Sequence, residues 1–350
     1  MKRREFLIAS AAALATAGCE PAEKKKPVDP RLMGLELPEP TPEQCAKKRK
    51  DAPSLVALVR CETYEDDLFN NLKQSLDLVN MPDLKGKRVL IKPNMVEIQP
   101  GHPITTNPAV LAAGIRLADY LGAKEVIVGE GPGHMRDTEM LLKKSGLGPM
   151  CVKMGVPFID LNLDDLKAVS IQNSFTGMKR VYMPKHIVEA DVVISMPKLK
   201  THHWVGATCS MKNLFGTVPG RKYGWPKNIL HIKGIPRWIL DLQDIVRPKF
   251  AIVDAIVAME GDGPINGTAK PAHFIAMGDD LAAVDATCIR TMSFTLDDIP
   301  YIKLAGLVVG NVDESQIKVG GASIASLRQV FQKPITMLGV VTANSGHQGG

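Results

Sequence analysis

The chain has 350 residues, of which 45% are hydrophobic, 23% charged and 5% aromatic, and its formal net charge is +6. These values are typical of a globular protein that buries its core as one large or two modest domains. The positive charge gathers in the first 26 residues and again around positions 198 to 233. A general nucleic-acid surface would need a wider basic stripe with interleaved aromatic residues. We therefore expect no nucleic-acid partner, and instead recognition of phosphate or carboxylate at one locus.

The amino terminus has the features of an export signal. A twin arginine at positions 3 and 4 is followed by a Phe-Leu pair, as in twin-arginine signals. The apolar stretch 8–18 is too short to span a bilayer and has the length of a signal hydrophobic region. It ends at Cys19 in a segment that resembles a bacterial lipobox, with Thr16 in place of the usual aliphatic residue. The alternative interpretation is a buried, Ala-rich helix preceded by basic residues.

We expect residues 1–19 to be a signal peptide that is read by the twin-arginine export machinery. Lipidation of Cys19 would then anchor the protein to a membrane as a periplasmic lipoprotein. Residues 20–50 mix Pro, Lys and Glu with little periodicity, as a tether does, and residues 51–350 form the α/β body. The twin-arginine route moves folded proteins, often after a cofactor has been inserted.

Beyond residue 50, short apolar runs alternate with helical patterns. The runs that predict strands are Leu55–Val59, Arg88–Ile91, Glu125–Val128, Asp191–Met196, Phe250–Val257 and Phe274–Met277. The patterns that predict helices are Tyr64–Val79, Pro108–Leu121, Ala282–Met292 and Ile299–Val308. Asn107 is a suitable N-cap for the second helix, with Pro108 at its first position. This alternation predicts an α/β fold with a mainly parallel central sheet and helices on both faces.

Polar residues follow several predicted strands, where an α/β protein builds its binding sites. Lys92–Asn94 follows one strand, Gly129–Asp137 another and Glu260–Pro264 a third. The densest segment begins after Pro197 and has the composition of a loop. Its cations and imidazoles are Lys198, Lys200, His202, His203, Lys212, Arg221, Lys222 and His231. We expect this edge of the sheet to hold an anionic or metallic ligand, with Asn94 also in contact with it.

Single residues of this cluster also have structural interpretations. Lys198 and Lys200 could be a solvated strand end, and Lys212 could pair with an acid such as Asp254. The acids between positions 254 and 262 could bind a hard cation or shape a Gly-rich turn.

The cysteines give little support for a metal cluster. The six cysteines show no Cys-x-x-Cys spacing, so a cluster ligated wholly by local cysteines is not supported. Cys288 lies in an apolar helical pattern and is expected in the core. The separation of Cys45 and Cys61 leaves open whether they pair in an oxidising compartment.

Several motifs recur in the order found in one bacterial and archaeal family. They are Lys92-Pro93-Asn94, Thr105-Thr106-Asn107-Pro108, Gly129-Glu130-Gly131, the block 191–222 and the segment 278–286. Over about residues 55 to 310 the chain resembles the family catalogued as domain of unknown function 362. The resemblance implies fold and boundaries more than a reaction, because the family has no agreed activity. Some members carry ferredoxin-like iron–sulfur modules, which this sequence lacks.

A more distant likeness suggests a mechanism. The order and spacing of His134, His202, Lys212 and His231 look like those of the nickel-pincer-dependent lactate racemase family. The likeness implies that Lys212 tethers the cofactor, that His231 binds the metal, and that His134 and His202 transfer protons. Imidazole suits both metal binding and proton transfer near neutrality. The segment 208–211 departs from the family, which has a run of glycines there.

Two classes of function follow from these patterns. In the first, the protein is a redox or isomerase-type enzyme of unknown substrate, with Lys198, Lys200, Lys212, Arg221, Lys222 and Asn94 binding an anionic cofactor. A metal ion would be bound by His231 and His202. In the second, it is a non-catalytic envelope protein that captures an anionic small molecule with the same lysines and arginine.

Overall fold

The computed structural model describes residues 35, 37–48, 53–133, 137–225, 227 and 229–337. The chain divides into Met1–Met33 and Gly34–Gly350, and the second of these units contains all of the described residues. The export signal, the lipidation site Cys19 and the predicted acid–base residue His134 lie outside the described residues.

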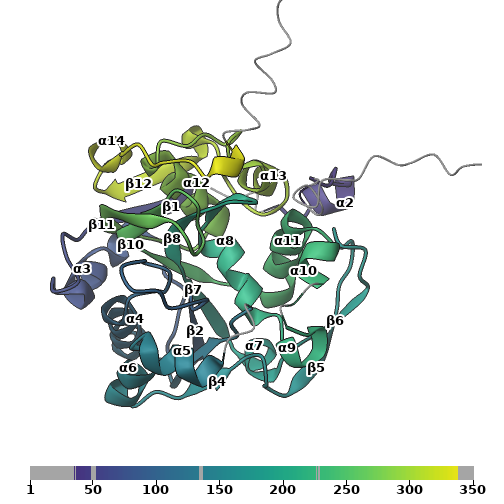
Figure 1. The fold of residues 1–350 in the computed structure, drawn as a ribbon, viewed down its shortest axis with the longest axis horizontal. Coiled ribbons are helices and arrows are strands. Elements are labelled where there is room, and N and C mark those ends of the chain that lie inside the picture. The colour runs from purple at the N-terminus through teal and green to yellow at the C-terminus, as the bar shows by residue number, and fades with distance from the viewer. Residues whose placement is uncertain are drawn as a thin grey trace, which may run out of the picture. The chain divides into compact units, whose positions relative to one another are not determined.

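A large sheet forms the centre of the unit Gly34–Gly350 (Figure 1). Its strands follow the order β12 (Ile317–Gly321), β1 (Ser54–Arg60), β11 (Thr268–Gly278), β10 (Phe250–Glu260), β7 (Val192–Met196), β2 (Arg88–Pro93), β3 (Glu125–Glu130) and β4 (Phe158–Asp160). A further strand, β8 (Lys198–His202), pairs with β10 and with β9 (Gly206–Thr208). Strand β11 is antiparallel to both neighbours and β9 to β8, whereas the other pairs are parallel. The predicted mainly parallel sheet is confirmed.

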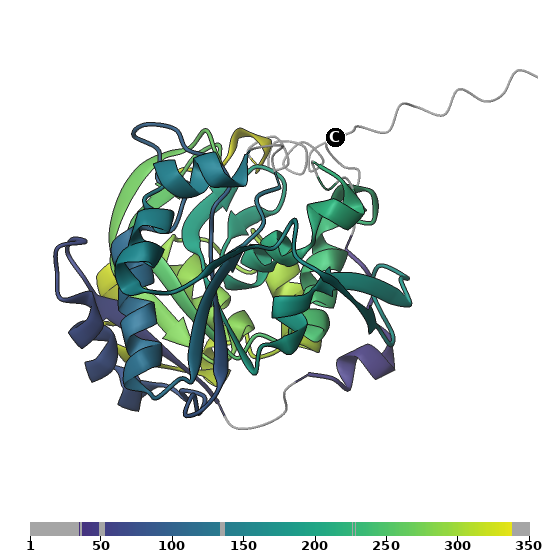
Figure 2. The same cartoon turned by 90° about the horizontal axis from the view of Figure 1, so that it is seen from below.

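Helices cover both faces of this sheet, as predicted (Figure 2). Alternate residues of a strand point to opposite faces, so Val89 and Ile91 pack in one core cluster and Leu90 in another. The first face is covered by α3 (Leu68–Gln74), α4 (Pro108–Tyr120) and α6 (Leu147–Met154). The second is covered by α8 (Ser210–Asn213), α11 (Ile235–Val246), α12 (Leu281–Thr291) and α13 (Pro300–Val308). Cys288 of α12 is fully buried, in agreement with the predicted core position.

The remaining elements are short. They comprise α2 (Pro42–Cys45), α5 (Thr138–Lys144), α7 (Lys185–Glu189), α9 (Gly220–Tyr223), α10 (Ile229–Ile232), α14 (Ile324–Leu327), η1 (Leu76–Leu78), η2 (Leu214–Thr217) and η3 (Glu314–Gln316). Strands β5 (Leu166–Ser170) and β6 (Arg180–Pro184) pair as a separate antiparallel sheet.

Local signals predicted one helix correctly and another too long. Helix α4 begins after Asn107, whose side chain accepts a hydrogen bond from the Ala109 amide, and Pro108 occupies its first turn. The predicted helix Tyr64–Val79 is instead the shorter α3, capped by Asp67, followed by η1. The reason is tertiary: the Tyr64 hydroxyl lies 3.0 Å from Asp254 Oδ1 and so takes part in a buried polar contact.

Two segments expected to be irregular are folded. Residues after Pro197 continue as β8 and turn back as β9, so the predicted loop is a hairpin here. Part of the predicted tether forms α2, where Thr41 and Gln44 make a capping box. The Gln44 amide donates to the Asn173 carbonyl at 2.8 Å. The folded body therefore begins before residue 51.

Candidate functional site

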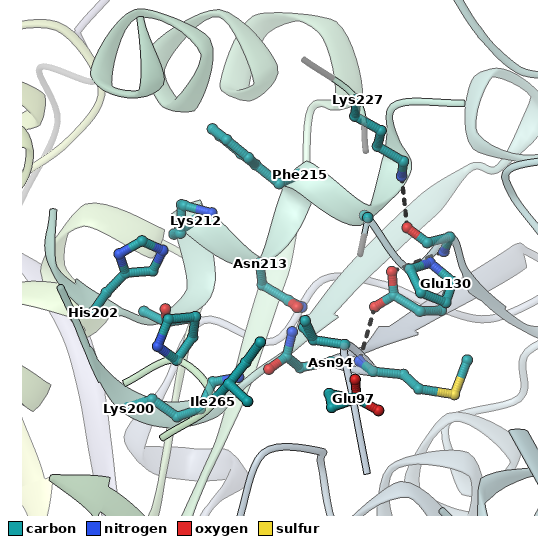
Figure 3. A pocket seen from close by; sticks show the side chains of 18 of the residues that line it. Asn94, Glu97, Glu130, Lys200, His202, Lys212, Asn213, Phe215, Lys227 and Ile265 are labelled. Carbon is teal, nitrogen blue, oxygen red and sulfur yellow. Dashed lines mark hydrogen bonds between the residues drawn. The ribbon is translucent and has the colours of Figure 1, made fainter. Parts of the chain in front are cut away.

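A cavity of about 1120 Å³ opens at the edge of the sheet where β2, β3 and β8 end. It collects five of the predicted site residues, namely Asn94 after β2, Lys200 and His202 of β8, Lys212 of α8 and His231 of α10. In Figure 3, Lys200, His202 and Lys212 lie on one side, Glu130 and Lys227 on the other, and Asn94 and Asn213 between them. Residues that follow β2 and β3 therefore line one cavity together with residues of β8.

A buried ion pair joins the ends of β2 and β3 beneath the cavity. Lys92 Nζ lies 2.5 Å from Glu130 Oε2, and both side chains are almost fully buried. Lys92 Nζ also donates to Asn213 Oδ1 at 3.2 Å. Gly216 packs directly on the pair, because a Cβ at that position would lie 1.8 Å from Glu130 Oε1. Close approach of backbone to a buried carboxylate thus requires glycine here.

Helix α8, which carries Lys212, is held by hydrogen bonds to α12 and to two strands of the sheet. The Asp285 carboxylate accepts hydrogen bonds from the Ser210 and Met211 amides at 2.8 and 3.1 Å. The Asn213 side chain donates to the Lys92 carbonyl and to Ser195 Oγ. These bonds connect the helix to β2, β7 and α12, so Lys212 is presented to the cavity from a rigid element.

Besides the exposed Lys144, three lysines on the cavity wall have no carboxylate partner among the described residues. Lys200 Nζ donates to the Ile104 carbonyl at 2.8 Å, and Lys227 Nζ to the Gly131 carbonyl at 2.6 Å. Lys212 Nζ lies 3.7 Å from the centre of the Phe215 ring. The acids Glu97, Glu130 and Asp262 also line the cavity, and Glu130 is paired with Lys92. The interior therefore offers positive charge to an anion.

Burial makes these amines weak bases. Desolvation lowers the pKa of Lys212 to about 7, assisted by the charge of Lys92. Desolvation likewise lowers the pKa of Lys227 to about 7. The pKa of Lys200 falls well below its ordinary value, through burial and then the charge of Lys212. A bound anion would favour the charged forms, so anion binding and proton uptake are linked.

Four aromatic rings line another part of the cavity. The rings of His202 and His203 are stacked with centroids 5.1 Å apart, and the Trp204 ring makes edge contacts with those of His203 and His231. Desolvation, followed by the charge of Lys212, lowers the pKa of His231 to about 4 and that of His202 well below its usual value. Both imidazoles are neutral at neutral pH, the form that binds metals and accepts protons.

Two buried oxygens of cavity-lining residues have no hydrogen-bond partner among the described residues, Asn94 Oδ1 and Thr208 Oγ1. Buried polar atoms are normally paired, and an unpaired one is costly. A ligand that donates hydrogen bonds would satisfy both. Asn94 itself is held by its backbone amide, which donates to Thr106 Oγ1 at 2.8 Å.

Three other predicted site residues, Lys198, Arg221 and Lys222, do not line the cavity. Lys198 is buried in an ion pair with Asp254, with Nζ 2.6 Å from Oδ2, and does not line the cavity. Arg221 is exposed and donates to the Leu163 carbonyl, and the exposed Lys222 lies over the Tyr182 ring. Arg221 and Lys222, which were predicted to bind an anionic cofactor, therefore do not line the cavity.

Lys227 and Thr208 are among the cavity-lining residues that the sequence did not predict. Lys227 has a positive φ of 58° and reaches the Gly131 carbonyl, which is 96 positions away in the sequence. Thr208 ends the unpredicted strand β9. Local sequence carries no signal for either position.

Among the described residues, no group of three or more His, Cys, Asp or Glu side chains is arranged to hold a metal ion.

The lowered lysine pKa values predict how stability depends on pH. Between pH 7 and about 8.5 the unfolded chain, with ordinary lysines, binds more protons than the ligand-free native protein, so the free energy of unfolding should rise with pH. Above that range the raised pKa values of buried cysteines oppose the trend. Thermal denaturation should show Tm increasing across the window, with a smaller slope for Lys212→Met. An unchanged slope in the variant would contradict the depressed pKa of Lys212.

The model for the family described as "Domain of unknown function (DUF362)" matches residues 89–290. The chain belongs to this family. It is also 29% identical over 241 residues to a thylakoid-associated protein of Synechocystis, a match that covers 66% of this chain and 72% of that protein. In the part of the chain that the structure describes, no helix has the length and apolar character needed to cross a membrane.

Two solved structures show distant likenesses. The lactate racemase apoprotein from Thermoanaerobacterium thermosaccharolyticum is 14% identical, with a TM-score of 0.41, and the match covers 73% of this chain and 60% of that one. A structural-genomics protein from Thermotoga maritima is 12% identical, with a TM-score of 0.33 and coverage of 59% and 54%.

Proposed function

We propose that this protein binds an organic anion, as substrate or cofactor, in the cavity at the edge of its sheet. The observation that carries the proposal is the set of wall lysines Lys200, Lys212 and Lys227, which lack carboxylate partners among the described residues. Natural proteins bury lysines at such cost only when they are paired or used. The volume of about 1120 Å³ matches an organic molecule rather than a simple inorganic ion.

A redox or isomerase-type enzyme is the function that this site supports best. Positive charge at the wall would hold the anion, while the neutral imidazoles of His202 and His231 could accept a proton or ligate a metal ion. A metal bound there would polarise the substrate as a Lewis acid. It would need further ligands besides these two imidazoles, from the bound anion or from water.

A non-catalytic binding protein is the alternative, because charge complementarity alone would also explain the lysines. The metal content and the visible spectrum of protein purified from its native host distinguish the enzyme from the binding protein. A stoichiometric metal or a visible chromophore supports the enzyme, whereas a colourless, metal-free protein that carries an anion supports binding alone.

The binding experiment uses substitutions on the wall. A charge-assisted hydrogen bond contributes about 1.5–3 kcal/mol, so Lys212→Met and Lys227→Met should each lower retention of the co-purifying anion about tenfold or more. Mass spectrometry of the denatured extract measures this retention. Lys222→Met is the matched control, because Lys222 also lies over an aromatic ring but outside the cavity. Equal retention in all three variants would reject the anion site.

We further propose that the protein is exported and lipid-anchored, with residues 1–19 as signal. The twin arginine supports this proposal. In addition, the relative of this chain in Synechocystis is named as a thylakoid-associated protein. Replacing Arg3 and Arg4 by Lys should leave the precursor in the cytoplasm, as measured by fractionation. Cys19→Ala should separately remove labelling by a fatty-acid probe while export continues. Normal export of the twin-lysine variant would overturn the assignment.

A further inference from the structure

Lys212 differs from Lys92, Lys200 and Lys227 in having a free amine within the cavity, whereas Lys144, which also lines the cavity, is exposed to solvent. The amines of Lys92, Lys200 and Lys227 are each held by an oxygen acceptor, from Glu130, Ile104 and Gly131 respectively. Lys212 has neither a side-chain hydrogen bond nor an ion pair with any described residue, and its amine rests on the Phe215 ring. It is also partly accessible, whereas Lys200 and Lys227 are fully buried.

The surroundings favour the neutral, nucleophilic form of this amine. Lysine is activated as a nucleophile when it is desolvated in an apolar pocket or placed beside another cation. Both conditions hold here, because burial and the charge of Lys92 lower the pKa of Lys212 to about 7. At neutral pH a substantial fraction of the amine therefore carries a free electron pair.

Groups that would recognise an anion lie around the same amine. The charge of Lys212 acts on Lys200 strongly enough to lower its pKa, so the two amines are electrostatic neighbours. Thr208 of the cavity wall carries a buried hydroxyl with no partner among the described residues, and this hydroxyl can donate a hydrogen bond to a carboxylate oxygen. A carboxylate held by Lys200 would leave an adjacent carbonyl carbon free to approach Lys212.

We propose that Lys212 is a nucleophile that forms an imine with a carbonyl-bearing carboxylate, such as a 2-oxo acid, bound in this cavity. The inference rests on the proposed anion site and adds its substrate class and a covalent step. The amines of Lys200 and Lys227, whose charged forms a bound anion favours, select for the carboxylate. The free Lys212 Nζ then determines which bond forms.

The step balances without an oxidant or a reductant. The Lys212 nitrogen pair attacks the carbonyl carbon, the C=O π pair moves to oxygen, and a proton passes through water from nitrogen to that oxygen. The carbinolamine hydroxyl takes up a second proton from solvent, and the nitrogen pair then forms C=N as the C–O bond breaks and water leaves, which gives the protonated imine. The protonated imine withdraws electrons from the neighbouring carbon, which eases loss of a proton there, the chemistry that an isomerase needs.

Borohydride trapping tests the imine directly. The full-length protein is incubated with pyruvate, reduced with sodium borohydride, and analysed by intact mass and peptide mapping. We expect one added carboxyethyl group, located on Lys212, in at least tenfold excess over any other lysine. Acetone, a carbonyl without a carboxylate, should label Lys212 at least tenfold less. Lys212→Arg should abolish the adduct, whereas Lys222→Met should leave it unchanged.

Calorimetric titration of the unreduced protein with pyruvate measures binding alone. It therefore distinguishes failure of the imine from failure of the proposed anion site. Pyruvate binding without a Lys212 adduct would overturn the imine and leave the anion site standing. Labelling spread evenly over surface lysines, or equal labelling in Lys212→Arg, would also overturn it. Absence of both binding and adduct would overturn the 2-oxo acid as substrate class, while retention of the native anion in the wall variants tests the site itself.

Discussion

Replacement of Asp254 by Ala is expected to lower the free energy of unfolding by about 3–5 kcal/mol. Asp254 Oδ2 lies 2.6 Å from Lys198 Nζ, and both side chains are shielded from solvent. The carboxylate also accepts hydrogen bonds from the Tyr64 hydroxyl at 3.0 Å and the Asn107 amide at 2.8 Å. Removing it leaves a buried ammonium group without compensation, which costs far more than the pair itself contributes.

Urea denaturation followed by circular dichroism measures this loss. Lys270→Ala provides the control, because its pair with Glu260 spans 3.4 Å near the surface and should contribute less than about 1 kcal/mol. The double variant Lys198→Met with Asp254→Leu should recover most of the loss, since an apolar pair of similar volume removes the uncompensated charge. A single variant as stable as the control would show that the pair is not buried as described.

Gly216→Ala is expected to destabilise the protein by about 3 kcal/mol and to open the floor of the cavity. The added Cβ would lie 1.8 Å from Glu130 Oε1 and 2.7 Å from Lys92 Nζ. Glu130 must then move, which breaks the ion pair or displaces η2, and overpacking alone costs about 1–3 kcal/mol. Chemical denaturation gives the stability, and retention of the co-purifying anion reports on the cavity.

Gly133→Ala is the matched control for this substitution. It also lines the cavity, but its Cβ would meet only Lys227 Cδ at 3.8 Å, an ordinary contact. Stability within about 0.5 kcal/mol of the parent protein is therefore expected. Loss of stability in both variants would indicate a general intolerance of the cavity loops rather than a specific clash with Glu130.

Local sequence was sufficient wherever neighbouring residues decide the structure. Asn107 and Pro108 begin α4 because an N-cap and a proline satisfy the helix start without distant partners. The apolar runs that became β7 and β10 are buried on both faces, as the central strands of a parallel sheet must be. The shared edge of the sheet follows from the same alternation, because parallel strands place their carboxyl ends together.

Which of the predicted cationic side chains line the cavity was decided only by the tertiary structure. Lys198 and Lys200 lie two positions apart in β8, yet Asp254 of β10 neutralises Lys198, while Lys200 continues to the edge and meets the cavity. Lys227 reaches the wall through a contact that spans 96 positions in the sequence. Sequence patterns identify which residues can carry charge and where strands end. The burial and pairing of each charge depend on long-range contacts that periodicity does not encode.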